Sequence, residues 1–308
     1  MTFSATEAAF EGFRVVRRKP TALIWWAALY FLLSVASLAA MGANADAWIE
    51  FVRISEQMEQ TPAGQPPSQE EFMALFNAMF GAIASFAWLL PVQLVVTSVL
   101  TAAIARAVTR PGESAFGYMR LSMDEVRVFV VTLVLAIVLF AVWCAAILGV
   151  GVLMAIAFSI GEGWAGLLVL VGIVAAVGLM IWLMVRWSLA VPITVAEKRM
   201  AFFDSFAVTK GRFWGLLGMA ILAGIMAIVI GLLSTVVVAP LTMMSGVSMF
   251  GGMSGDDPTA MLEAYRTFNP WMLVTALVNA VVYGLTVGVV YAPFAAAYRD
   301  IKGVSATG

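Results

Sequence analysis

Histidine is absent from the chain, and cysteine occurs only once, as Cys144. Without histidine the chain lacks the side chain that most often serves as a general base and a metal ligand. A lone cysteine inside an apolar run excludes a disulfide within the chain and is typical of a small packing residue. Charged residues make up only 11% of the chain, hydrophobic residues make up 63%, and the mean hydropathy is +0.99. This composition excludes an ordinary soluble domain and indicates an integral membrane protein.

Long apolar runs predict six transmembrane helices in one polytopic domain that covers residues 1–308. Each run reaches the roughly 20 residues needed to cross a hydrocarbon core of about 30 Å. Because lipid-exposed irregular backbone is not tolerated at that depth, we expect an all-α fold. The first run is longer than the core of a signal peptide, about 7–15 residues, so cleavage is disfavoured. The predicted spans are 21–42, 82–107, 126–160, 165–185, 214–239 and 271–297.

The basic residues are sorted to one side of these six spans. Fifteen of the seventeen lysines and arginines fall in the terminal segments and in the loops on that same side, whereas Arg53 and Arg266 lie opposite. Loops that remain in the cytoplasm are enriched in lysine and arginine. The pattern therefore predicts a multi-pass protein of the bacterial inner membrane with both termini in the cytoplasm.

A short amphipathic stretch precedes each odd-numbered span and predicts a threefold repeat. Ala9-Phe10, Ala115-Phe116 and Phe202-Phe203 can be aligned, and Ser4 and Ser122 each have a glutamate three residues later, the spacing of a capping box. In the first stretch one helical face carries Phe10, Phe13 and Val16, and another carries Glu7, Glu11, Arg14 and Arg18. We expect three units, each a cytoplasmic amphipathic helix followed by two spans. The alternative is that basic amphipathic connectors are simply common in polytopic proteins.

Two longer segments, 43–70 and 241–270, are expected outside the membrane on the opposite side. Residues 61–68 form a cluster of helix breakers between two helical stretches, and a further helix is expected over 258–266. The second segment also contains Met243, Met244, Met249 and Met253. Methionine clusters can bind soft metal ions, but here no histidine or cysteine completes a ligand set, so loop packing is favoured.

The spans carry few groups capable of chemistry. Their central portions lack Asp, Glu and Lys, which argues against a proton-coupled transporter. Arg106, Arg127 and Arg186 lie at span ends, where their side chains can extend to the membrane surface. Gln93 and Asn279 either join helices by hydrogen bonding or line a polar cavity. Among the pairs of small residues inside the predicted spans, Gly284 and Gly288 form the one full GxxxG motif.

Catalytic motifs are missing from the sequence. It contains no glycine-rich phosphate loop, nucleophile elbow or cluster of metal ligands. We therefore predict a non-enzymatic protein without cofactor, metal ion or nucleic-acid partner.

The connector between the fourth and fifth spans, residues 186–214, carries a family resemblance. Pro192, Glu197, Ser205-Phe206 and Lys210 follow a pattern similar to that of the bacterial six-span family named after the membrane domain of glycerophosphodiester phosphodiesterases. In the enzymes that give the family its name, catalysis belongs to a separate barrel domain with acidic and histidine residues. The resemblance therefore implies a membrane module without diesterase activity.

Two functions from different classes remain open. The first is a membrane scaffold or accessory protein that contacts anionic phospholipid head groups at the cytoplasmic face, a membrane-protein partner or further copies of itself. The second is a channel or facilitator for a neutral or amphiphilic solute, which a cavity reaching Gln93 and Asn279 would favour and a packed interior would contradict. For the first function, the connector is either a structural elbow or part of a basic collar that contacts lipid or a partner. The candidate residues are Arg14, Arg18, Arg120, Arg186, Pro192, Glu197, Lys198, Arg199, Phe206, Lys210 and Arg212.

Overall fold

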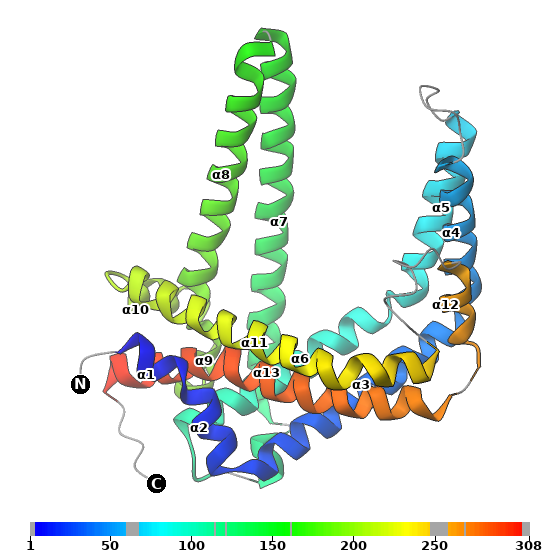
Figure 1. Cartoon of the computed structure of the whole chain (residues 1–308). Helices are drawn as coiled ribbons and strands as arrows, with labels where there is room; N and C mark the ends of the chain where they lie inside the picture. The colour runs from blue at the N-terminus through cyan, green and yellow to red at the C-terminus, as the bar shows by residue number, and fades with distance from the viewer. Residues whose placement is uncertain are drawn as a thin grey trace. The chain divides into compact units, whose positions relative to one another are not determined.

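The computed structural model describes residues 4–59, 68–113, 115–120, 122–160, 162–246, 258–267 and 269–303. Within these residues the regular elements are all helices, which confirms the predicted all-α class (Figure 1). Their bounds are α1 (Ala5–Ala9), α2 (Glu11–Arg18), α3 (Pro20–Ala43), α4 (Ala45–Glu59), α5 (Gln69–Phe86), α6 (Leu89–Thr109), η1 (Ala115–Tyr118), α7 (Met123–Ile160), α8 (Glu162–Trp187), α9 (Ala190–Glu197), α10 (Asp204–Thr209), α11 (Phe213–Ser245), α12 (Pro258–Ala264) and α13 (Pro270–Lys302).

Six of the described helices, α3, α6, α7, α8, α11 and α13, are long and apolar enough to cross a membrane. They coincide with the six predicted spans and indicate a multi-pass membrane protein. The third span is one continuous helix of 38 residues. The second span begins at Leu89 rather than at residue 82, because a turn at Ala87 and Trp88 separates α5 from α6. Pro91 therefore lies in the first turn of α6. Backbone N–H groups in that turn have no acceptor within the helix, so the missing N–H of proline costs no helical hydrogen bond.

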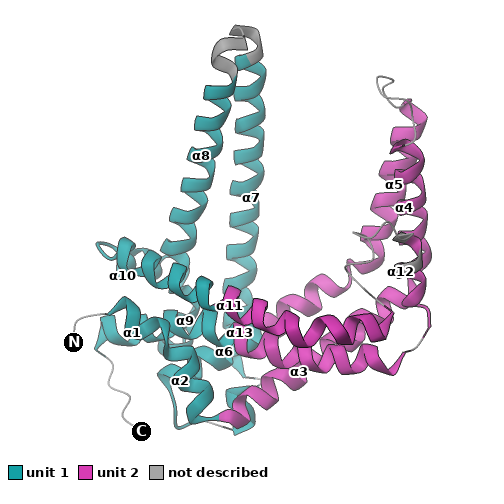
Figure 2. Ribbon diagram, viewed as in Figure 1, with its two compact units in different colours: residues 1–19, 98–226, 287–308 teal, residues 20–97, 227–286 magenta. Residues whose placement is uncertain are grey.

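The chain forms two compact units, shown in different colours in Figure 2. Unit 1 comprises residues 1–19, 98–226 and 287–308, and unit 2 comprises residues 20–97 and 227–286. Because α6, α11 and α13 each contribute to both units, neither unit is a continuous stretch of sequence. The fifteen basic residues that the sequence places on one side all belong to unit 1, and Arg53 and Arg266 belong to unit 2. The single polytopic domain stays a prediction.

Unit 1 contains a long hairpin of α7 and α8, whose helices lie side by side (Figure 1). Gly172 of α8 allows a close approach, since a Cβ there would lie 2.8 Å from Leu153 Cδ1. Helix α2 packs even more tightly on α13, because a Cβ on Gly12 would lie 2.5 Å from Val289 Cα. Leu189, Ile193 and other apolar side chains of the α8–α9 region are fully buried within the unit.

The threefold repeat is not confirmed. The first amphipathic stretch is helical but divided at Phe10 into α1 and α2, and the third is the six-residue helix α10. The prediction of a second amphipathic helix is wrong, because Phe116, Gly117 and Tyr118 have φ values of 49°, 65° and 65°. These angles are incompatible with a right-handed helix. The Tyr118 carbonyl instead accepts a hydrogen bond from Arg106, so a tertiary contact fixes the turn.

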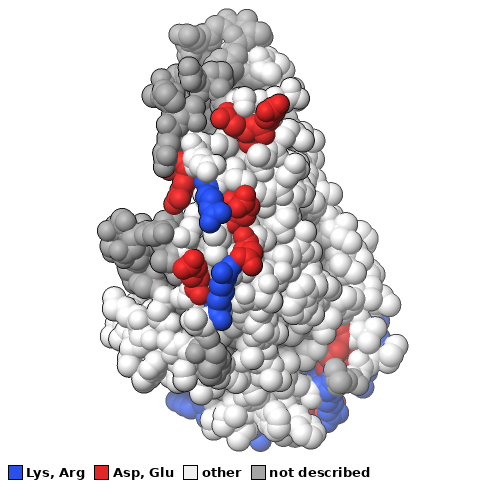
Figure 3. Space-filling model, turned by 90° about the vertical axis from the view of Figure 1, so that its right-hand side faces the viewer, with Lys and Arg blue, Asp and Glu red and all other residues white. Residues whose placement is uncertain are grey.

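Unit 2 contains a group of three helices, α4, α5 and α12, in which α4 packs against both others. Ala45, Ile49 and Leu262 form its core, and the Trp48 ring meets Phe86 at a centroid distance of 6.0 Å. Acidic side chains gather on this group with basic side chains among them, as Figure 3 shows, and Arg266 pairs with Asp46. The expected helices on either side of the breaker cluster are therefore present, and α12 ends two residues earlier than predicted.

The rest of the predicted loop features falls largely outside the described residues. Of the breaker cluster only Ser68 is described, and Met249 and Met253 are not. Met243 and Met244 belong to the last turn of α11. Among the described residues no group of three or more His, Cys, Asp or Glu side chains could hold a metal ion.

Candidate functional site

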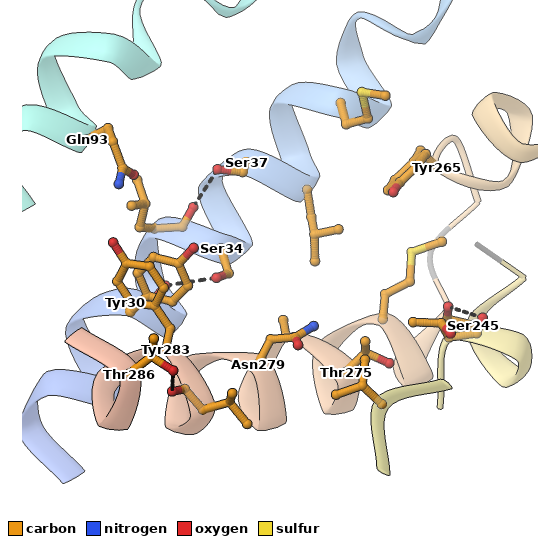
Figure 4. Close-up of a pocket in the computed structure, with 18 of the residues that line it drawn as sticks. Tyr30, Ser34, Ser37, Gln93, Ser245, Tyr265, Thr275, Asn279, Tyr283 and Thr286 are labelled. Carbon is orange, nitrogen blue, oxygen red and sulfur yellow. Dashed lines mark hydrogen bonds between the residues drawn. The ribbon is translucent and has the colours of Figure 1, made fainter. Parts of the chain in front are cut away.

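Unit 2 contains a cavity of about 770 Å³ among its membrane-spanning helices. Lining side chains come from α3, α5, α6, α11 and α13, together with Tyr265 beyond α12 (Figure 4). The lining includes both Gln93 and Asn279, the two amides that the sequence predicts at membrane depth. The structure therefore brings these residues to one cavity.

Two helices present their polar side chains to this cavity in helical register. Tyr30, Ser34 and Ser37 lie on one face of α3, and Thr275, Asn279, Tyr283 and Thr286 lie on one face of α13. The hydroxyls of Ser34, Ser37 and Thr286 donate to carbonyl oxygens of their own helices at 2.8–2.9 Å. Because a hydroxyl oxygen also has acceptor capacity, these groups remain able to accept hydrogen bonds from a bound molecule.

The two amides differ in their surroundings. Gln93 Nε2 donates to Thr97 Oγ1 at 3.4 Å, within α6. The Asn279 side chain is exposed and points from α13 into the cavity (Figure 4). Its amide has no hydrogen bond to a described residue, so it offers one acceptor and two donor hydrogens to a bound molecule.

A stacked pair of aromatic rings, Tyr30 and Tyr283, forms part of the wall. Their centroids lie 3.6 Å apart with an interplanar angle of 13°. Close packing of α3 against α13 permits this contact, because Gly284 faces Leu23, Trp26 and Ala27 across the helix interface. The predicted GxxxG motif is therefore used within the chain: Gly284 contacts α3, and Gly288 is approached by Gly12 of α2.

Charged groups do not line the cavity among the described residues. Apart from hydroxyl and amide groups, the cavity is lined by apolar side chains, such as Leu33, Met41, Phe86, Val238 and Met272. An ionised ligand would have to enter without a counter-charge, at a large desolvation cost. The arrangement suits an uncharged molecule with a hydrogen-bonding part and an apolar part.

Unit 1 has a second polar centre around Arg106, which the sequence did not predict. The Arg106 side chain is 1% exposed, and its Nη2 lies 2.7 Å from Glu125 Oε1 and 3.7 Å from Asp124 Oδ2. Arg110 pairs with Asp124 as well, 3.1 Å from its Oδ2, and also donates to the Val195 carbonyl. Arg106 lies near the end of its span, as the sequence indicates, but its side chain is buried inside the unit, where acids at the start of α7 pair with it.

Two further ion-pair groups hold the ends of unit 1's helices. Glu11 of α2 is paired with Arg299 of α13 at 3.4 Å. Glu197 accepts a hydrogen bond from the Tyr298 hydroxyl at 2.8 Å and pairs with Arg199 at 2.6 Å. These contacts tie both α2 and α9 to the last turns of α13.

The connector also contains an ion pair between Arg199 and Asp204. Arg199 donates to both carboxylate oxygens of Asp204, at 2.9 and 3.0 Å. These hydrogen bonds hold the pKa of the Asp204 carboxyl below its ordinary value. The bidentate pair therefore closes the loop that leads into α10.

The predicted lipid- or partner-facing residues are distributed over several contacts instead of one site. Arg14 and Arg18 pair with Glu11, Arg120 pairs with Glu113, and Glu197 pairs with Arg199. Arg186 donates to the Phe206 carbonyl and to Thr209 and lies over the Trp182 ring, while Pro192 is buried. Lys198, Lys210 and Arg212 are exposed. Thus many of the predicted basic residues are already paired with acids of the same unit.

Comparisons with known proteins place the chain in no family. A scan of family models, a search of curated proteins and a search of solved structures each found no match.

Proposed function

We propose that this multi-pass membrane protein is a non-enzymatic facilitator that binds an uncharged, amphiphilic solute in the cavity of unit 2. The observation that carries the proposal is the joint placement of Gln93 and Asn279 on one cavity of about 770 Å³ without a charged lining residue. A pocket of this size lies within the range of sites that hold small organic ligands, about 300–1,000 Å³.

The composition of the cavity wall supports an uncharged solute in particular. Hydroxyl and amide groups from α3 and α13 replace the hydrogen bonds that a polar head group loses on leaving water. The apolar side chains accommodate a hydrocarbon part in the same cavity. Both requirements are met by an amphiphile without net charge.

The distribution of basic residues supports one orientation of the chain in the membrane. All fifteen lysines and arginines of the basic set belong to unit 1, and such residues are retained in the cytoplasm. We place both termini in the cytoplasm of a bacterium, with the chain in the inner membrane.

Transfer of a fluorescent lipid across proteoliposomes tests the function. NBD-labelled glucosylceramide is an uncharged amphiphile, and NBD-labelled phosphatidylserine is its charged counterpart. The full chain is expected to speed the appearance of the first probe, but not of the second, in the dithionite-accessible leaflet. The double variant Gln93→Leu with Asn279→Leu is expected to lose most of this effect.

Thr235→Val is the matched control, because Thr235 donates to the Leu232 carbonyl of its own helix and does not line the cavity. It should transfer the uncharged probe as fast as the wild type. Equal rates for the wild type and the double variant, or equal acceleration of both probes, would contradict the proposal.

A second candidate function is a scaffold or accessory protein that contacts anionic phospholipids, a membrane-protein partner or another copy of the chain. The observation that favours it is the exposed hairpin of α7 and α8, where a Cβ on Gly149 or Gly151 would meet nothing within 4 Å. The proposed resemblance to the six-span family, through Pro192, Glu197 and Lys210, fits the same role. Native mass spectrometry in mild detergent tests it, and only lipid-free monomers without a crosslinked partner would count against it.

A further inference from the structure

Unit 1 has a basic cleft of about 260 Å³, separate from the cavity described above. Its lining residues come from the end of α6 and just after it, from the stretch between η1 and the first turn of α7, and from the C-cap of α9. Four of its lining residues are basic and two are acidic. They are Arg106, Arg110, Arg120, Lys198, Glu113 and Asp124, and Ser122 and Met123 complete the wall.

Acids of the chain balance only part of this positive charge. Glu113 is shared by three arginines: its carboxylate lies 3.3 Å from Arg120, 3.7 Å from Arg110 and 3.9 Å from Arg106. Asp124 is shared in the same way, since it also pairs with Arg127 at 3.0 Å. When Glu125 and Arg127 are added to the lining residues, five basic groups face three acidic groups, so a surplus of two positive charges remains.

Lys198 is the basic group of the cleft whose ammonium makes no ion pair with a described residue. It is the C-cap of α9 and follows closely on Val195, whose carbonyl accepts a hydrogen bond from Arg110, the residue directly after α6. That bond joins the end of α9 to the residue directly after α6 and so positions Lys198 at the cleft. The side chain is exposed and free to reach a ligand.

We propose that this cleft binds a phosphate group, supplied by the head group of an anionic phospholipid or by free phosphate. A tetrahedral anion with several acceptor oxygens matches donors that converge from three segments, and arginine forks suit phosphate oxygens. The phosphate balances the surplus positive charge that the chain's own acids do not neutralise. The site depends neither on the cavity of unit 2 nor on the solute proposed for it.

Lys198→Gln and Lys210→Gln form a matched pair of variants for the test. Each removes one positive charge from an exposed lysine that caps a short helix of unit 1, and Lys210 lies outside the cleft. Both variants therefore change the long-range electrostatic field by one charge, but only Lys198→Gln removes a hydrogen-bond donor from the cleft. Arg120→Gln removes a second cleft donor whose side chain is about half exposed.

The first arm titrates the full chain in a neutral detergent with potassium phosphate against potassium chloride at equal ionic strength, following the unfolding midpoint by tryptophan fluorescence. The second arm replaces phosphate with nanodiscs that contain phosphatidylglycerol in phosphatidylcholine. In whichever arm binding occurs, Lys198→Gln and Arg120→Gln are expected to weaken it about tenfold, the scale of one charge-assisted contact, and Lys210→Gln to leave it unchanged.

The two arms identify the source of the phosphate group. A midpoint rise with inorganic phosphate assigns the site to free phosphate, and a rise that requires phosphatidylglycerol assigns it to a lipid head group. Absence of a rise in both arms would overturn the proposal. Equal weakening by Lys198→Gln and Lys210→Gln would overturn it as well, because it would indicate general surface attraction.

Discussion

Glu11 is 2% exposed, and three arginines surround its carboxylate. Arg14, Arg18 and Arg299 lie 3.3, 3.7 and 3.4 Å from its oxygens. Replacing Glu11 removes the acid that these three arginines share, and losing a hydrogen bond to a charged group costs about 1–3 kcal/mol. We expect Glu11→Gln to lower the free energy of unfolding by an amount in that range, measured in detergent by thermal or denaturant unfolding.

Glu7→Gln is the control for this prediction, because Glu7 is exposed in the neighbouring helix α1. It should change the free energy of unfolding little. An equal effect of the two substitutions would contradict the role given to Glu11.

Two buried charged residues have partners that the sequence pattern does not reveal. The helical pattern placed Glu11 on a polar face with Glu7, Arg14 and Arg18, but the structure buries Glu11 under Arg299, which lies 288 positions along the chain. Arg106 lies near the end of a span, where its side chain could extend to the membrane surface, and the structure encloses it with Asp124 and Glu125. A pattern within one helix contains no information on a partner from a distant segment.

At the scale of helices, the contact of α2 with α13 depends on the absence of a side chain at Gly12. A Cβ there would lie 2.5 Å from Val289 Cα and 2.6 Å from the Gly288 carbonyl oxygen. Both neighbours are backbone atoms and cannot rotate away, so α2 would have to move. We expect Gly12→Ala to lower the free energy of unfolding by about 1–3 kcal/mol, the scale of overpacking.

Gly149→Ala in α7 is the matched substitution, since a Cβ at Gly149 would meet nothing within 4 Å. It should be neutral or stabilising, because alanine favours a helix more than glycine does. A loss of stability as large as that of Gly12→Ala would show that close packing is not the cause.

The start of α5 predicts a pH dependence. Ser68 and Glu71 form a capping box, and the hydrogen bond from the Ser68 backbone holds the pKa of the Glu71 carboxyl below its ordinary value. A lowered pKa in the folded state stabilises the fold above the unfolded-state pKa, and this stabilisation is lost as the pH falls through the folded-state pKa. We expect the difference in unfolding midpoint between wild type and Glu71→Gln to be largest above about pH 5 and to disappear in more acid solution. A difference that does not change with pH would contradict this.

Helices were predictable from the sequence to different degrees. The six spans follow from apolar runs, because a bilayer demands length and internal hydrogen bonding. The break between α5 and α6 at Ala87 and Trp88 lies inside an apolar run and leaves no mark in the hydropathy. The turn around Phe116 was mistaken for a helix, because its left-handed backbone depends on the hydrogen bond from Arg106.

At the scale of the whole molecule, the two units differ in their charged residues and in the cavities they contain. Unit 1 contains fifteen of the seventeen basic residues together with many of the acids that pair with them, and unit 2 contains a cavity without charged residues among its described lining. The sequence identified Gln93 and Asn279 as the notable amides of the spans but left open whether they join helices or line a cavity. Only the packing of α3 against α13 could decide, because it sets which faces of the helices meet.

The most direct test of the proposed solute cavity is native mass spectrometry of the full chain, released from its own membranes in mild detergent. We expect the wild type and Thr235→Val to carry an uncharged amphiphile as a bound mass. Asn279→Leu should reduce its occupancy about fivefold, the effect of losing roughly one hydrogen bond. A wild-type chain without such a mass, or equal occupancy in Asn279→Leu, would contradict the proposal.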